Sequence, residues 1–452
     1  MMRRRMLFTN MQNRSAERKG NLKMMNERAY EHTKYFVEEC GIRVAGTESV
    51  IKGSDYILDY YKKYGIKTET HEFDVPVCEI LKSQLKVREK GDWVSLNHTP
   101  ALFSRSTKPG GVTLPLVYVE DGSVANLRSG DVKGKAVLIC RDAYMVYPDI
   151  KMYKRLKEFD VAAVIYTSGE GHWDVPYVYA NFETMDEDYT IPTAVIHSST
   201  AKEIVLNNVS EVFLDIQFNV SLKKSRNTLG IIEGSKYPEQ SVVVCAHLDS
   251  TVGSTGAVDD ATGVAVVMEL ARYYQELENK GIQPDRTIRF IAWSGHECGI
   301  HGSKFYLLDH PHIFDNISFV LNFDGIGSVL SNYSAVGGCT PKIEAKLNEI
   351  TRSLDLDWPI VMEPAVVDAL NFAAKEIAHI TLFAGVGCGC HTKYDTMDLV
   401  SAAGFNSPFI FSKAVIDWAV GEDKIEHGFP PELAEALKET SKMYGWGLFG
   451  LV

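Results

Sequence analysis

The sequence lacks a disulfide framework and any long apolar run. Its 8 cysteines are scattered singly among 452 residues, apart from Cys388 and Cys390, and this spacing is typical of a reducing compartment. No apolar run approaches the roughly 20 residues that a membrane-spanning helix needs. We therefore expect neither a disulfide-stapled domain nor a membrane protein, and a cytoplasmic location is the expectation that follows.

Basic residues are also in deficit. Lys and Arg number 47 against 59 Asp and Glu, which gives a formal net charge of −12. A negative balance argues against nucleic acid or an anionic membrane as the main partner. Nothing in the composition decides between a monomer and a homodimer, so a homodimer is left open.

The first 24 residues are basic and polar. Their apolar stretch, MLFTNM, is too short and interrupted for the core of a signal peptide, which takes at least about seven apolar residues. We expect residues 1–24 to form a disordered tail.

Short apolar runs indicate a central sheet. SVVVCA, TIRFIAW and ISFVLNF are rich in Val, Ile and Phe and are bounded by Gly, Ser, Asp and Pro, a pattern typical of buried parallel strands. Apolar spacings of three and four, closed by a glycine, predict helices over residues 26–41 and 48–65. The expected fold class is α/β, with a mostly parallel sheet between layers of helices.

Candidate metal ligands follow these runs. Ligands in an open α/β sheet collect beyond the carboxyl ends of the strands, and an imidazole or a carboxylate stands after each run. An aspartate before a predicted helix and a histidine in a glycine-rich loop complete a set of five. The set is His247, Asp259, Glu297, Asp324 and His391.

Five such donors suit two metal ions better than one. Imidazole nitrogens and carboxylate oxygens bind zinc and leave a position for water, and paired ions lie about 3.5–4 Å apart. Cobalt and manganese fit the same donors. The plainer interpretations are a structural histidine for His247 and a helix cap for Asp259. Cys388 and Cys390 by themselves are a weak indication of a thiolate site.

The order of the motifs resembles that of the co-catalytic dizinc exopeptidases, which include bacterial aminopeptidases, glutamate carboxypeptidases and glutaminyl cyclases. H-x-D, D-x-x-[ST]-G, E-x-G-x-x-G-S, N-x-D and H-T-x-x-D-T occur in that order within residues 229–418. The resemblance implies a zinc exopeptidase-like fold and two zinc ions per chain. It also implies the ligands: His247 and Asp324 for one ion, Glu297 and His391 for the other, and Asp259 as the bridge.

Two residues are expected in the catalytic step. The family has Glu-Glu where this chain has His296 and Glu297, and the first Glu moves a proton from water to the leaving amine. An imidazole can act as a base near neutral pH, so we expect His296 to carry the proton, with an impaired site as the alternative. Asp249 matches the family's aspartate that orients the ligand imidazole, here that of His247.

Asp368 and Tyr394 are expected to contact substrate. Asp368 matches the aspartate of the family's S-D-H-x-x-F pattern, although Ala369 replaces the histidine. Cys390 replaces the aromatic hydroxyl that precedes the last histidine in several relatives, and we expect Tyr394 to compensate for it.

The chain is expected to divide into a catalytic domain over residues 25–76 and 221–421, an insert over residues 77–220 and a tail over residues 422–452. The apolar runs LPLVYV, KAVLIC, VAAVIYT and IPTAVI in the insert resemble a β-rich protease-associated domain. The aromatic and acidic loop 169–190 is either a lid over the site or a packed surface loop.

These expectations together point to a metal-dependent exopeptidase. The favoured activity is that of an aminopeptidase on short peptides, with two zinc ions and His296 as the base. A carboxypeptidase or amide hydrolase of the same fold is one alternative. A binding protein with impaired catalysis is the other.

Overall fold

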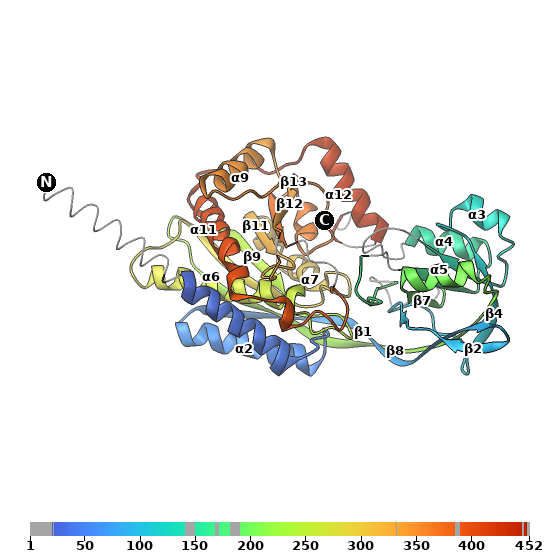
Figure 1. The fold of residues 1–452 in the computed structure, drawn as a ribbon. Helices are drawn as coiled ribbons and strands as arrows, with labels where there is room; N and C mark the ends of the chain where they lie inside the picture. The colour runs from blue at the N-terminus through green and yellow to red at the C-terminus, as the bar shows by residue number, and fades with distance from the viewer. Residues whose placement is uncertain are drawn as a thin grey trace, which may run out of the picture.

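The computed structural model describes residues 20, 22–140, 150–167, 171–180, 190–330, 332–384, 389–444 and 447–449. Most of the predicted tail, much of the loop 169–190 and Cys388 lie outside the described residues. The chain forms a larger body and a smaller one, and a long two-stranded ribbon joins them (Figure 1).

Three parallel strands form the centre of the larger body, as predicted. β9 (Tyr237–His247) pairs in parallel with β10 (Arg286–Trp293) on one side and β11 (Ile317–Phe323) on the other. β14 (His379–Phe383), β12 (Ser334–Gly338) and β13 (Ile360–Met362) extend the sheet beyond β11, with β12 antiparallel to β14. The mostly parallel α/β class is thus confirmed.

Helices cover both faces of this sheet because successive residues of a buried strand point to opposite sides. Val242 and Val244 of β9 pack in one core cluster, and Val243 and Cys245 pack in another. The first cluster lies under residues 22–34, η1 (Tyr35–Cys40), α2 (Glu48–Tyr64), α6 (Thr262–Glu278), α9 (Pro341–Ser353) and α11 (Asn406–Gly421). The second lies under α7 (His301–Asp309), α8 (Pro311–Phe314) and α10 (Ala369–Ala373).

The glycines that were predicted to end the first two helices lie at positions with a positive φ. Gly41 follows η1 with φ 71°, and Gly65 follows α2 with φ 77°. A positive φ suits glycine because it has no Cβ to clash with the following carbonyl.

The ribbon connects the two bodies without a break. β1 (Lys67–Glu89) and β8 (Glu211–Ile232) pair antiparallel along almost their whole length. The predicted division at residues 77 and 220 crosses this ribbon, where Val77 pairs with Ser221 and Cys78 with Val220. The boundary between the two bodies therefore lies within continuous strands, and no linker in the sequence marks it.

The smaller body is an α/β unit rather than a β-rich one. The four predicted strands form β4 (Val112–Tyr118), β5 (Ala136–Ile139), β6 (Ala163–Thr167) and β7 (Thr193–Ile196), all paired in parallel. Helices α3 (Val124–Ser129), α4 (Ile150–Glu158) and α5 (Ser198–Leu206) occur between or after them, and β2 (Asp92–Ser95) and β3 (Thr99–Pro100) are short additions. β4 also pairs with β8, which attaches this sheet to the ribbon.

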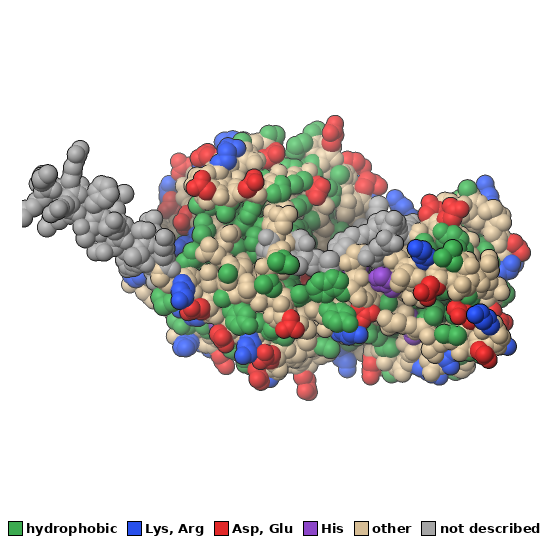
Figure 2. Space-filling view, viewed as in Figure 1, with side chains coloured by type: hydrophobic (Ala, Val, Ile, Leu, Met, Phe, Trp, Pro, Cys, Tyr) green, Lys and Arg blue, Asp and Glu red, His purple; other side chains and the backbone are tan. Residues whose placement is uncertain are grey.

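The described part of the tail packs on the body. α12 (Pro431–Tyr444) follows η4 (Met397–Leu399), η5 (Ala402–Phe405) and α11, and the side chains of Leu437 and Leu448 are fully buried. Acidic side chains gather over the upper part of the larger body, and both signs are mixed over the rest of the visible face (Figure 2). Among the described residues, no helix has both the length and the apolar character to cross a membrane.

Candidate metal centre

The five predicted ligands come together at one edge of the sheet. His247 is the last residue of β9, Asp324 follows β11, and Glu297 follows β10 by four residues. Asp259 lies in η3 (Ala257–Ala261), directly before α6, and His391 lies in the loop after β14. Parallel strands end at the same edge of a sheet, so their following residues share one region.

Asp259 lies between the two histidines. Its Oδ1 is 3.0 Å from His247 Nε2, and its Oδ2 is 3.3 Å from His391 Nε2. Glu297 Oε2 is 3.1 Å from the same His391 nitrogen. Asp324 groups with His247 and His296, since one donor atom from each of the three lies within 4.8 Å of the others.

The donor set fits metal ions. Oε1 of Glu297 is buried and has no hydrogen-bond partner among the described residues, although an unpaired buried carboxylate oxygen is costly. Burial raises the pKa of Asp324 to about 6, even though His296 and His247 lower it. Burial lowers the pKa of His247, but the neighbouring carboxylates, Asp259 first, raise it well above the usual value. The centre therefore favours added positive charge, which a divalent cation supplies.

Asp249 orients its neighbours differently from the expectation. The main-chain carbonyl of Asp249, not its carboxylate, lies 2.9 Å from His247 Nδ1 and accepts its hydrogen bond. The carboxylate instead accepts from the backbone N–H groups of His296 and Glu297, each at 3.1 Å. The Asp249 side chain thus positions the turn that carries the base position and a ligand.

Asp368 lies behind His296 and does not face a substrate, which corrects the expectation. It is only 1% exposed, and its Oδ2 is 2.9 Å from His296 Nδ1. Its other oxygen accepts a hydrogen bond from the hydroxyl of Ser303, which in turn accepts from the Asn371 amide. Both carboxylate oxygens are therefore occupied by the protein itself.

The hydrogen bond to Asp368 decides which nitrogen of His296 carries the proton. An ionised carboxylate only accepts hydrogen bonds, so Nδ1 of His296 carries the proton and Nε2 of the neutral ring is the acceptor. That nitrogen lies 3.8 Å from Asp324 Oδ2. The ring stacks on His247 with centroids 3.8 Å apart and planes 7° apart. His296 thus turns its Nε2 toward the metal ligands.

Three further residues shape the centre, and sequence reasoning did not assign these roles to them. Asp260 accepts hydrogen bonds from the backbone N–H of Gly325 and Gly263, and Asp395 accepts from those of Val258 and Asp259. The thiol of Cys390 lies 2.7 Å from Asp259 Oδ2. An Asp-Asp pair before a helix was the available signal for Asp260, and the H-T-x-x-D-T motif was the signal for Asp395.

Comparisons with known proteins agree with this geometry. Residues 227–408 match the sequence model of Peptidase family M28. The matched segment contains all five candidate ligands. Carboxypeptidase Q of Xenopus laevis is 26% identical over 350 residues, which cover 72% of this chain and 71% of that protein. Aminopeptidase YwaD of Bacillus subtilis is 27% identical over 287 residues, which cover 62% of this chain and 57% of that protein.

Two solved structures share the fold. The peptidase M28 precursor from Shewanella amazonensis matches with a TM-score of 0.75 at 19% identity, over 93% of this chain and 99% of that chain. A zinc aminopeptidase from Bacillus subtilis matches with a TM-score of 0.71 at 22% identity, over 89% of this chain and 98% of that chain. The likeness covers both bodies and not the M28 segment alone.

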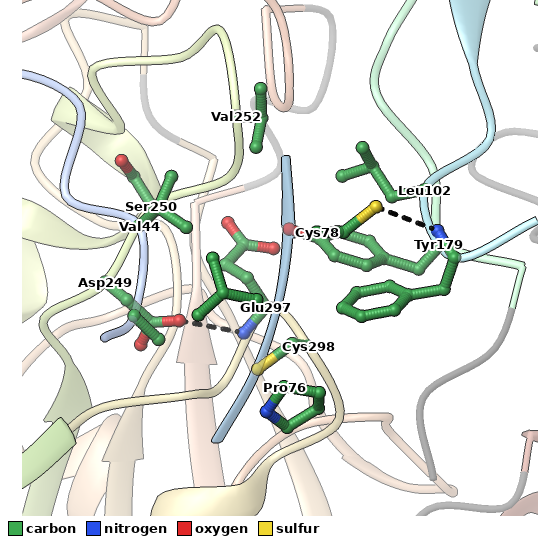
Figure 3. Close-up of a pocket in the computed structure, with 13 residues that line it drawn as sticks. Val44, Pro76, Cys78, Leu102, Tyr179, Asp249, Ser250, Val252, Glu297 and Cys298 are labelled. Atoms are coloured by element: carbon green, nitrogen blue, oxygen red, sulfur yellow. Dashed lines mark hydrogen bonds between the residues drawn. The ribbon is translucent and has the colours of Figure 1, made fainter. Parts of the chain in front are cut away.

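A pocket lies beside the M28 centre, between the two bodies. The carboxylate of Glu297 points into it, and Val252 and Tyr179 lie on either side (Figure 3). The enclosed volume of the pocket is about 20 Å³, and Leu102 and Phe103 of the smaller body add apolar walls. Tyr394, in contrast, is 43% exposed, and its contact with substrate stays a prediction.

Proposed function

We propose that the protein is a metal-dependent exopeptidase, in the first place an aminopeptidase that hydrolyses short peptides with two zinc ions per chain. The observation that carries the proposal is the position of Asp259, whose two oxygens face His247 and His391 separately. A carboxylate with one oxygen toward each half of the site is the arrangement that a bridging ligand requires. The similarity of residues 227–408 to peptidase family M28 and the zinc aminopeptidase among the structural relatives support the same activity.

The residues divide into two sets of donors. His247 and Asp324 would hold one ion, Glu297 and His391 the other, and Asp259 both. When bound, zinc supplies Lewis acidity, which polarises a carbonyl and lowers the pKa of a water molecule.

His296 would move the proton. Its Nε2 faces Asp324, and Nδ1 is bonded to Asp368, so Nε2 can take a proton while the other side of the ring stays fixed. The carboxylate of Asp368 stabilises the imidazolium that results, because hydrogen bonds that involve ionised groups are the stronger ones. The same nitrogen would then return the proton to the leaving amine.

The smaller body would be a protease-associated-like unit that shapes the substrate pocket rather than one that carries catalytic groups. Leu102 and Phe103 in the pocket wall support that role. A reducing, cytoplasmic location is part of the proposal, supported by seven described cysteines that are all free thiols.

The test combines elemental analysis with a substrate panel. Purified wild type should contain about two zinc ions per chain and cleave peptides with a free amino terminus faster than N-blocked ones. A preference for N-blocked peptides with a free carboxyl terminus would indicate a carboxypeptidase. Inactive wild type that gains activity on His296→Glu would indicate a binding protein, and absence of bound metal after reconstitution would overturn the proposal.

A further inference from the structure

The loop that carries His391 contacts the smaller body directly. Tyr177 donates its backbone N–H to the carbonyl of His391 at 3.0 Å. In return Nδ1 of His391 donates to the carbonyl of Tyr177, also at 3.0 Å. A ligand of the M28 centre and a residue of the smaller body thus exchange two hydrogen bonds, although they are 214 positions apart in the sequence.

Residues 174–179, here called the contact segment, make further contacts with the larger body. Asp174 forms an ion pair with Lys393 at 2.9 Å, and the hydroxyl of Tyr179 lies 2.9 Å from that of Thr251. The ring of Tyr177 packs so closely on Gly253 that a Cβ built there would lie 2.3 Å from it. The segment therefore contacts the loop after β9 and the loop of His391 together.

The opposite side of the contact segment is bonded to the smaller body. Thr99 donates its hydroxyl to the carbonyl of Pro176 at 2.7 Å, and Asn97 donates to Asp174 at 2.8 Å. Thr99 belongs to β3, which pairs with β7 of the smaller sheet. A continuous path of hydrogen bonds thus runs from that sheet to His391.

The bond from Nδ1 determines how His391 can bind a metal. It places the proton on Nδ1 and directs Nε2 at Asp259 and Glu297, which lie 3.3 and 3.1 Å away. Such bonds fix the tautomer and the orientation of a ligand imidazole, and their loss typically weakens metal binding about 10-fold to 100-fold. His391 also has a φ of 58°, an uncommon conformation for a residue with a side chain, which needs support from its surroundings.

We propose that the smaller body is a positioning element of the metal centre: through the Tyr177 backbone it fixes the imidazole of His391, so that the ion held by Glu297 and His391 binds tightly only when the two bodies are docked. The inference rests on the two-ion centre of the proposed function. The ion held by His247 and Asp324 has no such dependence, since His247 donates to Asp249 within the larger body.

Metal titration of two variants tests this inference from both sides of the contact. Tyr177→Ala removes the ring that packs on Gly253. Gly253→Ala changes no residue of the smaller body but forces the same ring to shift, and it also strains residue 253, whose φ is 80°. Zinc would be titrated against a competing chelator of known affinity, with thermal melts to check folding. In both variants we expect one binding step to weaken about 10-fold to 100-fold and the other step to stay within twofold of wild type.

Matched controls separate positioning from general damage. Tyr177→Phe keeps the ring and the backbone contact and should bind both ions as wild type does. Lys133→Ala removes an exposed ion pair with Asp160 elsewhere on the smaller body and should also change neither step. Lys393→Ala, at a residue whose side chain is 67% exposed, perturbs the contact without threatening the fold and should weaken the same single step by a smaller factor.

The outcomes distinguish the inference from the proposed function. If wild type binds two ions and Tyr177→Ala and Gly253→Ala bind both with unchanged affinity, the inference is wrong and the exopeptidase proposal stands. Equal weakening of both steps in folded variants also overturns it, because a positioning role affects only one half of the centre. If wild type binds fewer than two ions, the two-ion proposal fails and the inference fails with it.

Discussion

Replacement of Asp368 by asparagine should lower turnover without weakening substrate binding. The carboxylate is 1% exposed and lies 2.9 Å from Nδ1 of His296. Asp368→Asn conserves the size of the side chain, and its carbonyl oxygen can still accept from Nδ1, while its amide can donate to Ser303. The variant therefore removes the negative charge and keeps both the tautomer and the packing.

The expected loss follows from the change in one hydrogen bond. A bond to a charged partner contributes about 1.5–3 kcal/mol, against about 0.5–1.5 kcal/mol for a neutral pair. Proton transfer to the neutral ring creates the charged form of His296, so the difference of about 1 kcal/mol or more falls on the transition state. Since 1.36 kcal/mol corresponds to a factor of ten, we expect kcat to fall roughly 5-fold to 20-fold with KM nearly constant.

Steady-state kinetics on a free-amine peptide substrate measure this effect. Asp417→Asn is the matched control. Asp417 lies on α11, outside the metal centre, and accepts a hydrogen bond from the hydroxyl of Tyr274 at 2.7 Å. Its replacement should leave kcat unchanged. A rise in KM with unchanged kcat would show that Asp368 contacts substrate after all. Unchanged kcat and KM would refute the role of Asp368 in proton transfer by His296.

Two further predictions concern stability. Glu269 is fully buried; burial opposes its ionisation, but bonds from His32 and Arg272 hold its pKa at about 2, below the usual 4.5. Because the pKa of Glu269 is lower in the folded than in the unfolded protein, its ionised carboxylate stabilises the fold above about pH 4.5. About 3 kcal/mol of the free energy of unfolding should be lost as the pH falls from about 4.5 to 2. In urea denaturation, the stability of Glu269→Gln should lack most of this pH dependence. Gly302→Ala would place a Cβ 2.1 Å from the Ser294 carbonyl oxygen, and we expect it to lower the free energy of unfolding by about 1–3 kcal/mol; an unchanged melting temperature would contradict this.

Much of the larger body was predictable because its signals are local. The strands ending at His247 and at Trp293 are continuous apolar runs, and such runs indicate strands that are buried on both faces. Gly65 ended a helix as expected, because the left-handed backbone conformation that often follows a helix is adopted mainly by glycine. His247, Glu297 and Asp324 followed from strand ends, since topology brings those ends to one edge. The other two candidate ligands followed from a helix start and a glycine-rich loop.

The ribbon and the α/β character of the smaller body were not predictable in the same way. The division expected at residue 77 lies inside β1, whose partner β8 is distant in the sequence. The pairing of strands that are distant in the sequence produces no local sequence signal. A domain boundary in the middle of a strand is therefore not accompanied by a linker. The helices α4 and α5 alternate with the parallel strands β5, β6 and β7, and this alternation makes the smaller body an α/β unit.

The amino-acid sequence by itself determined which chemical groups are available and where each lies relative to a strand or helix end. The motif order that placed His247, Asp259 and Glu297 is a property of the chain alone. Only the tertiary structure decided the partners of those groups: Asp368 stands behind His296 rather than toward a substrate, and Tyr177 of the smaller body bonds to His391. The reason is physical, since hydrogen bonds depend on distances of about 3 Å between atoms and sequence separation does not encode those distances.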